Sequence, residues 1–68
     1  MKFSERLKEL RIENNLSQTE LAKKTDISQS AIAKWELGKT EPSASALLTL
    51  SLFFDVSVDY LIGKTDDY

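Results

Sequence analysis

Residues 16–36, with the sequence LSQTELAKKTDISQSAIAKWE, decide the fold because two helix starts follow each other within this segment. The first start is Ser17, which opens a capping box with Glu20. In this motif the serine hydroxyl accepts the backbone N–H of the glutamate, whose carboxylate reaches back to the serine N–H. Leu16 and Leu21 flank the cap as a hydrophobic staple, which fixes how the chain enters the helix. We therefore expect a helix that begins at Ser17.

A second helix start follows almost at once, at Ser28, where Ile27 and Ile32 repeat the staple. Only Thr25 and Asp26 are left to end the first helix before Ile27 begins the next. Two helices joined by so short a turn must cross steeply. The segment therefore predicts a helix-turn-helix.

Three further helices are predicted outside this segment, so the expected fold class is all-α with five helices. Apolar spacing indicates a first helix over about 4–13, and serine caps open helices over about 43–54 and 57–62. Gly38 and Gly63 are expected to end helices, because glycine readily adopts the left-handed conformation found there.

The 68 residues leave room for one domain, 1–68, in which we expect the polar tail 64–68 to be flexible. The helix over 43–54 is apolar on two stripes, so we expect neighbouring helices to enclose it. The longest nearly apolar run, 44–54, is too short to cross a bilayer, and charged residues interrupt the N-terminus. These features predict a cytoplasmic protein without a membrane segment.

The composition excludes several classes of protein. The chain has no cysteine and no histidine, which excludes disulfides, the usual zinc sites and thiol nucleophiles. Without these residues, catalysis needs paired carboxylates or an activated serine or lysine, and the acidic side chains are dispersed, so we expect no enzyme. We also expect no cofactor and no small-molecule effector, since no pocket for one is visible in the sequence. The net charge is −2, made of +2 over residues 1–40 and −4 over 41–68. The positive charge of residues 1–40 suits the binding of a polyanion to that part of the chain. Two differently solvated faces of one domain explain the asymmetry equally well.

The third predicted helix carries the most informative side chains. Ile32 and Trp35 are three residues apart and are expected to point to the core. The opposite side combines small, amide and ammonium groups without an acid: Gln29, Ser30, Ala33 and Lys34. Such groups can pair with adenine, reach guanine or a phosphate, and approach a thymine methyl. The face therefore predicts contact with a major groove, although an ordinary solvated helix face has the same composition.

Two other positions have both a binding and a structural interpretation. Gln18, in the first helical turn, can offer its amide and nearby backbone N–H groups to a phosphate, or can be a solvated helix former. Arg11 falls on the apolar stripe of the first helix, which favours a paired, partly buried charge over a DNA contact. Glu36, on the inward side of the third helix, is its expected partner.

Taken together, these segments resemble the helix-turn-helix of the Xre/Cro/CI-type repressors of bacteria and phages. The resemblance rests on residues 16–36, continues through 38–42 and 56–63, and covers about 4–63. It implies a compact, five-helix, lambda-repressor-like domain that binds operator DNA, commonly as a homodimer. The second helix would meet the phosphate backbone and the third would enter the major groove.

The resemblance also implies roles for individual residues. We expect DNA contacts at Gln18, Ser28, Gln29, Ser30, Ala33, Lys34, Lys39 and Thr40. Within this set Gln18 matches a glutamine that holds a phosphate. The positions that match base-reading residues are Gln29, Ser30 and Lys34. Arg11 and Glu36 match a structural ion pair, whereas Asp26 departs from the glycine usual in the turn.

We therefore expect a sequence-specific transcriptional repressor that binds a two-fold operator as a dimer, with half-sites about 34–36 Å apart. The small core and the apolar fifth helix suggest the dimer, whose interface is expected at Val58, Tyr60 and Leu61. The alternative is a protein-interaction module, such as an antitoxin-like partner, that has the same fold without reading bases. Salt-dependent binding to duplex DNA favours the first interpretation, and a large apolar patch beside the fifth helix favours the second.

Overall fold

The computed structural model describes residues 1–68 and contains five helices and no strand, which confirms the all-α fold. In chain order the helices are α1 (Phe3–Glu13), α2 (Gln18–Thr25), α3 (Gln29–Glu36), α4 (Ala44–Phe54) and α5 (Val58–Leu61). No helix combines the length and the apolar character that a bilayer crossing requires.

Serine caps begin four of the five helices, as the sequence predicts. The hydroxyls of Ser17, Ser28, Ser43 and Ser57 each accept the backbone N–H three residues further on, at 3.0–3.2 Å. The first cap is closed in both directions, because the carboxylate of Glu20 accepts the backbone N–H of Ser17 at 2.9 Å. Each cap satisfies an N–H group that a helix start otherwise leaves without a partner.

The turn between α2 and α3 depends on the backbone conformation of Asp26. This residue lies in the left-handed region, with φ 59° and ψ 27°, so the chain reverses direction within two residues. Gly38 has φ 73° and follows the last turn of α3 in the same way. An aspartate adopts this conformation at some cost in free energy, which a glycine avoids. The turn therefore forms as predicted, with a residue that is less suited to it than glycine.

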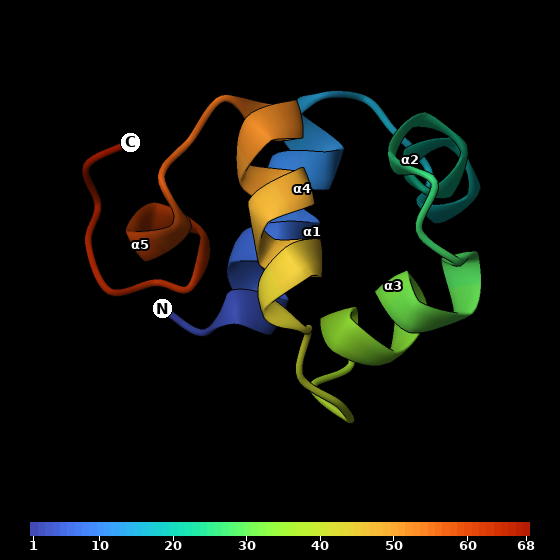
Figure 1. The fold of residues 1–68 in the computed structure, drawn as a ribbon, viewed down its shortest axis with the longest axis horizontal. Coiled ribbons are helices and arrows are strands. Elements are labelled where there is room, and N and C mark those ends of the chain that lie inside the picture. Colours follow the sequence, from blue (N-terminus) through green and yellow to red (C-terminus); the bar gives the residue numbers. More distant parts are fainter.

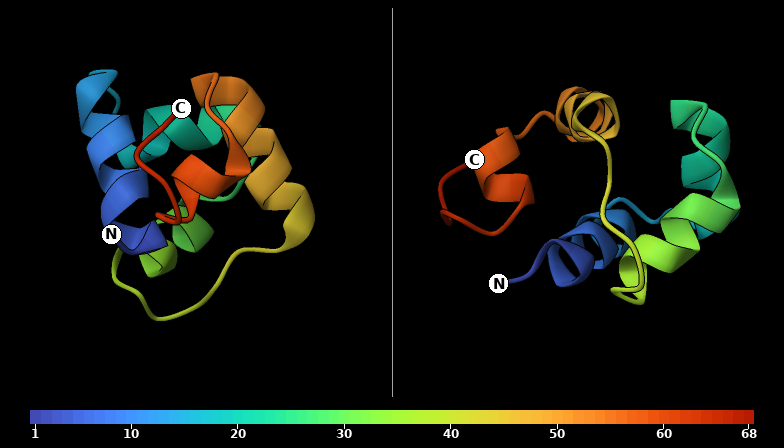
Figure 2. Two further views of the ribbon diagram at one scale, coloured as in Figure 1. Left: turned by 90° about the vertical axis from the view of Figure 1, so that its left-hand side faces the viewer. Right: turned by 60° about the horizontal axis from the view of Figure 1, so that its bottom comes forward.

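The helices are arranged so that α3 and α5 lie at opposite ends of the molecule. α1 packs against α3 and α5, α2 packs against α3 and α4, and α4 packs against α5. Figures 1 and 2 show α2 and α3 together at one end, and α5 with the C-terminus at the other, with α1 and α4 between them. Helices α1 and α4 thus pack against the inner side of the helix-turn-helix, and the opposite side of α3 is exposed to solvent.

The core draws on every helix. Its eight buried apolar residues are Leu7, Leu10, Leu21, Ile32, Trp35, Leu50, Tyr60 and Leu61. Each hydrophobic staple contributes to it, including a third one that Val56 and Leu61 form around the cap Ser57. The staple residues after the caps, Leu21, Ile32 and Leu61, are fully buried, and their partners Leu16, Ile27 and Val56 pack against the core. The staples therefore tie each helix start to the common core.

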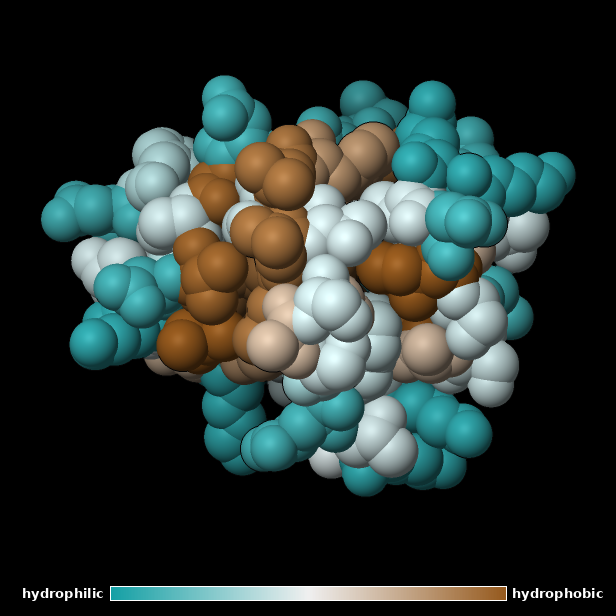
Figure 3. All heavy atoms as spheres, viewed as in Figure 1, coloured by the Kyte–Doolittle hydropathy of each residue, from teal (hydrophilic) through white to brown (hydrophobic).

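The expectation that neighbouring helices enclose α4 is wrong. Leu50 is fully buried, but Leu48 is 55% exposed, Leu52 is 73% exposed and Phe53 is 37% exposed. Figure 3, viewed as in Figure 1, shows apolar side chains gathered on the part of the surface where α4 runs. A chain of 68 residues has one small core, and α4 turns only one of its apolar stripes towards it. The other stripe faces solvent.

The C-terminal residues fold back onto α1 and α5. Asp66 accepts a hydrogen bond from Nη2 of Arg6 at 3.1 Å, and the ring centroids of Tyr60 and Tyr68 are 4.7 Å apart. The guanidinium of Arg6, only 3% exposed, lies 3.6 Å from the centre of the Tyr60 ring, a cation–π contact. Flexibility of the tail 64–68 stays a prediction, and in the structure these contacts hold the tail against the domain.

Candidate nucleic-acid interface

Helix α3 has an inner and an outer face. On the inner face Ile32 is fully buried and Trp35 is 7% exposed, and the indole ring meets the ring of Phe3 edge-on, with centroids 6.2 Å apart. On the outer face Gln29, Ser30 and Lys34 are exposed, and Ala33 between them is half-buried. The expected inward direction of Ile32 and Trp35 is therefore confirmed, and the side chains opposite them reach solvent.

Glu36 is the one acidic residue of α3, and it is turned away from the outer face. Its side chain is 5% exposed and pairs with Arg11, whose Nε donates to Oε2 at 2.7 Å and whose Nη2 donates to Oε1 at 2.9 Å. Nη1 of Arg11 donates to the backbone carbonyl of Leu16 at 2.8 Å. The bond to Glu36 raises the pKa of Arg11, although burial acts against it. The pair ties α1 to α3 and leaves the outer face without a negative charge.

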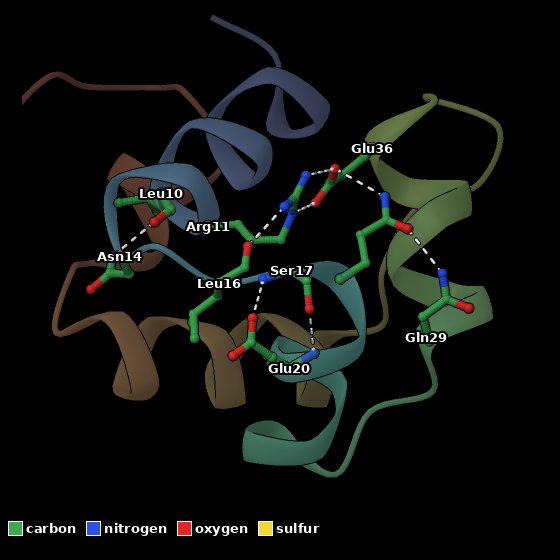
Figure 4. Close-up of polar contacts among 9 residues, drawn as sticks. Leu10, Arg11, Asn14, Leu16, Ser17, Glu20, Gln29 and Glu36 are labelled. Carbon is green, nitrogen blue, oxygen red and sulfur yellow. Dashed lines mark hydrogen bonds and ion pairs between the residues drawn. The ribbon is translucent and has the colours of Figure 1, made fainter.

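Two glutamine side chains extend this ion pair to the surface. Nε2 of Gln18 donates to Oε1 of Glu36 at 3.2 Å, and Oε1 of Gln18 accepts from Nε2 of Gln29 at 2.9 Å. Figure 4 shows the line of contacts that runs from Arg11 through Glu36 to Gln29. We call these four residues, Arg11, Glu36, Gln18 and Gln29, the polar network. It links α1, the start of α2 and the start of α3.

The start of α2 adds donors beside this network. The capping box at Ser17 satisfies the N–H of Glu20, and the N–H of Leu21 donates to the carbonyl of Ser17 at 3.0 Å. The first two backbone N–H groups of a helix have no partner within it, and here they belong to Gln18 and Thr19. Such groups, with the helix dipole, favour an anion.

The remaining expected contact residues lie at the edges of the α3 face. Ser28 is exposed, but its hydroxyl accepts the backbone N–H of Ala31 at 3.1 Å and is thus occupied as a cap. Lys39 and Thr40 are exposed in the loop that follows α3. The structure therefore places all eight expected DNA-contact residues around the outer face of α3 and the start of α2, with the loop after α3 as its far edge.

The expected dimer surface is not present as proposed from the sequence. Tyr60 is 5% exposed and Leu61 is fully buried, whereas Val58 is 36% exposed. The staple with Val56 draws Leu61 into the core, and Arg6 and Tyr68 cover the Tyr60 ring. A surface made of all three residues therefore does not exist in the single chain. Ile62, 39% exposed, is an apolar neighbour that remains accessible.

Comparison with known proteins decides the family. A profile described as Helix-turn-helix matches residues 7–61, which include α2, α3 and the whole of α4 and α5. The chain belongs to the helix-turn-helix family. The resemblance to Xre-type repressors drawn from residues 16–36 is thereby confirmed.

Two similar proteins are named as transcriptional regulators and a third as a repressor. The chain is 44% identical over 63 residues to the HTH-type transcriptional activator BcrR of Enterococcus faecalis, covering 93% of this chain and 31% of the activator. It is 42% identical over 66 residues to the uncharacterized HTH-type transcriptional regulator YqaE of Bacillus subtilis, covering 96% of this chain and 57% of that regulator. It is 38% identical over 60 residues to the repressor protein C2 of Salmonella phage P22, covering 88% of this chain and 28% of the repressor.

The chain thus spans between 28% and 57% of the length of these three relatives. Their names include an activator and a repressor, so family membership supports a DNA-binding regulator and leaves the sign of regulation open. At the level of the family, the expectation of a regulator rather than an enzyme is confirmed.

Sequence reasoning paired Arg11 with Glu36, and the structure brings the two together. It missed the two bonds of Gln18, to Glu36 and to Gln29, because it considered this side chain only as a phosphate ligand or a solvated residue. Both glutamines stand next to a serine N-cap, at the first position of their helices. In a helix-turn-helix the starts of the two helices lie close together. The presence of a glutamine at the first position of both helices was therefore the signal that could have predicted their contact.

Proposed function

We propose that this domain binds duplex DNA in a sequence-specific manner, with α3 in the major groove and the start of α2 on the phosphate backbone. The observation that carries the proposal is the outer face of α3, which is exposed and has no acid because Glu36 is turned inward and paired with Arg11. A carboxylate on this face would be repelled by the phosphates. Placing it inward lets the helix approach a polyanion closely.

The side chains of this face suit different parts of the DNA. Gln29 keeps its Oε1 and one N–H free after donating to Gln18, which is the donor and acceptor pair that adenine N7 and N6 require. Lys34 can reach guanine or a phosphate, and Ala33 with Ser30 leaves room for a thymine methyl. Gln18 keeps its second side-chain N–H for a phosphate, beside two unpaired backbone N–H groups. Ser28 and the exposed Lys39 and Thr40 border the same surface.

In this proposal the domain acts in the cytoplasm as a repressor. It binds a two-fold operator as a homodimer and thereby covers a promoter. The relatives include both a phage repressor and a transcriptional activator, so repression is the part of this proposal that a promoter assay has to decide. Exposed apolar side chains at α5, Val58 and Ile62, and the open stripe of α4 support a second copy. Sedimentation of the protein alone and with a two-half-site duplex tests this part. Monomers in both samples contradict it.

A second candidate function, a protein-interaction module, is favoured by the exposed apolar stripe of α4. Leu48 and Leu52 are more than half exposed there, and Phe53 lies beside them. Contiguous apolar surface of this kind marks protein interfaces. The two candidates differ in how binding responds to salt. If the domain binds DNA through phosphate contacts, its affinity for a duplex falls as the salt concentration rises. An affinity for duplex DNA that is independent of salt supports the second candidate.

The test is selection of bound duplexes from a random pool, followed by titration of the preferred duplex at two salt concentrations. We expect a defined sequence, and an affinity for it that Gln29→Ala lowers by about 1–3 kcal/mol. Lys34→Ala lowers the affinity as well, and reduces the salt slope by about one if the ammonium contacts a phosphate. Lys64→Ala is the matched control, since it removes the same charge from an exposed residue beyond α5. Enrichment of no sequence refutes the proposal.

A further inference from the structure

The carboxylate of Glu36 determines the direction of every hydrogen bond in the polar network. An ionised carboxylate only accepts hydrogen bonds and a guanidinium only donates them. Oε1 of Glu36 is shared between Nη2 of Arg11 at 2.9 Å and Nε2 of Gln18 at 3.2 Å. Gln18 must therefore turn its NH2 group to Glu36, because its amide oxygen has nothing to accept there.

This choice is passed on to Gln29. With its NH2 group at Glu36, Gln18 presents its oxygen on the other side, where Nε2 of Gln29 donates to it at 2.9 Å. Rotating the Gln29 amide by half a turn would bring two oxygens together, unless Gln18 turned as well and placed its own oxygen against the carboxylate. The buried charge thus fixes the orientation of an exposed amide on another helix start.

We infer that Glu36 is a positioning residue for base recognition: acting through Gln18, it determines which end of the Gln29 amide is donor and which is acceptor. The inference rests on the proposed function, in which Gln29 contacts a base edge. An amide recognises adenine by donating from its NH2 group to N7 and accepting at its oxygen from N6. The reversed amide places its oxygen against the acceptor N7 and its NH2 group against the donor N6. Glu36 excludes the reversed amide, and with it the bases that the reversed amide would fit.

The expected size of the effect follows from the bond that a reversal breaks. Turning both glutamines removes a hydrogen bond to a charged group, which corresponds to about 10- to 100-fold in an equilibrium constant. In Glu36→Gln the new carboxamide can keep its oxygen on Nε of Arg11 and turn its NH2 group towards Gln18, giving up only the bond from Nη2 of Arg11. The reversal then no longer places the Gln18 oxygen against a charged carboxylate. At the base pair that Gln29 reads, discrimination is the affinity for the preferred pair divided by that for the best alternative. We expect discrimination to fall by about tenfold or more.

The experiment measures this ratio with the selected duplex and its three single-pair variants, for the parent, Glu36→Gln, Gln29→Ala and the double variant. If Glu36 acts through Gln29, Glu36→Gln changes nothing further in the Gln29→Ala background. Leu50→Val is the control for stability, because it removes a buried methylene of α4 outside the polar network and should leave discrimination unchanged. A structural role of Glu36 predicts equal losses for all four base pairs.

The outcomes separate this inference from the proposed function. A parent without discrimination at any base pair refutes the proposed function itself. A parent that discriminates through Gln29 while Glu36→Gln discriminates equally well overturns the inference alone, as does an effect of Glu36→Gln that persists without Gln29. If Glu36→Gln does not fold, it is placed in the Asp55→Gly background. Asp55 ends α4 in the left-handed conformation, with φ 56°, so glycine should stabilise the domain away from this face. If that variant also fails to fold, Gln18→Met interrupts the polar network without touching the ion pair, and unchanged discrimination there overturns the inference.

Discussion

Replacing Arg11 by methionine keeps much of the side chain's volume but removes the guanidinium from the carboxylate of Glu36. The carboxylate is 5% exposed and would keep only the Gln18 amide, at 3.2 Å, as a partner, after losing two bonds of 2.7 and 2.9 Å. Removing one member of a buried ion pair costs about 3–5 kcal/mol, because the other charge stays buried without compensation. At about 0.05–0.15 kcal/mol per residue, a domain of this size has only about 3–10 kcal/mol in total.

Urea unfolding followed by far-ultraviolet circular dichroism measures this loss. We expect Arg11→Met to be marginally folded, and the double variant Arg11→Met/Glu36→Leu to recover most of the stability, because no charge is then left buried. The comparison of single and double variants isolates the coupling between the two side chains. If Arg11→Met unfolds within about 1 kcal/mol of the parent, the pair behaves as a surface ion pair and the reasoning is refuted.

Three further predictions concern stability. Trp35→Ala should cost about 3–5 kcal/mol by emptying a core position, and a variant with the parent's thermal melt contradicts the burial of the indole. Asp55→Gly should gain about 0.5–1 kcal/mol in urea unfolding, since Asp55 has φ 56° and carries a negative charge at the C-terminal end of α4; equal stability of the two proteins contradicts this. Hydrogen bonds from the backbone and the hydroxyl of Ser17 lower the pKa of Glu20, so the stability they provide is complete above about pH 4.3 and is lost as the pH falls through the lowered pKa. Glu20→Gln should flatten this acid loss in pH-dependent melts, and an unchanged profile argues against it.

Much of the fold was predictable because its signals are local. A serine cap and a staple lie within five residues of each other, so the starts of α2, α3 and α5 can be found without knowledge of any distant contact. The inner face of α3 follows in the same way from the spacing of Ile32 and Trp35. Even Arg11 and Glu36, on different helices, were matched, because each stands on an inward face and neither tolerates burial alone.

The features that the sequence did not predict depend on contacts between distant segments. Helix α4 has apolar residues on both sides, and only the packing of the other helices decides that Leu50 is buried while Leu52 is 73% exposed. The burial of Tyr60 depends on Arg6 and Tyr68, which are 54 and 8 residues away along the chain. No local pattern around α5 records these contacts, so Tyr60 was expected on the surface.

In the proposed function, the outer face of α3, with the start of α2, is the surface that binds DNA. Titration of the isotope-labelled protein with the selected duplex, followed by the side-chain amide signals of Gln18 and Gln29 and the backbone signals of Ser30 and Lys34, tests it most directly. We predict that these signals shift in proportion to the bound fraction. If they stay in place while the signals of Leu48 and Leu52 on α4 shift, another face binds the duplex and the account is contradicted.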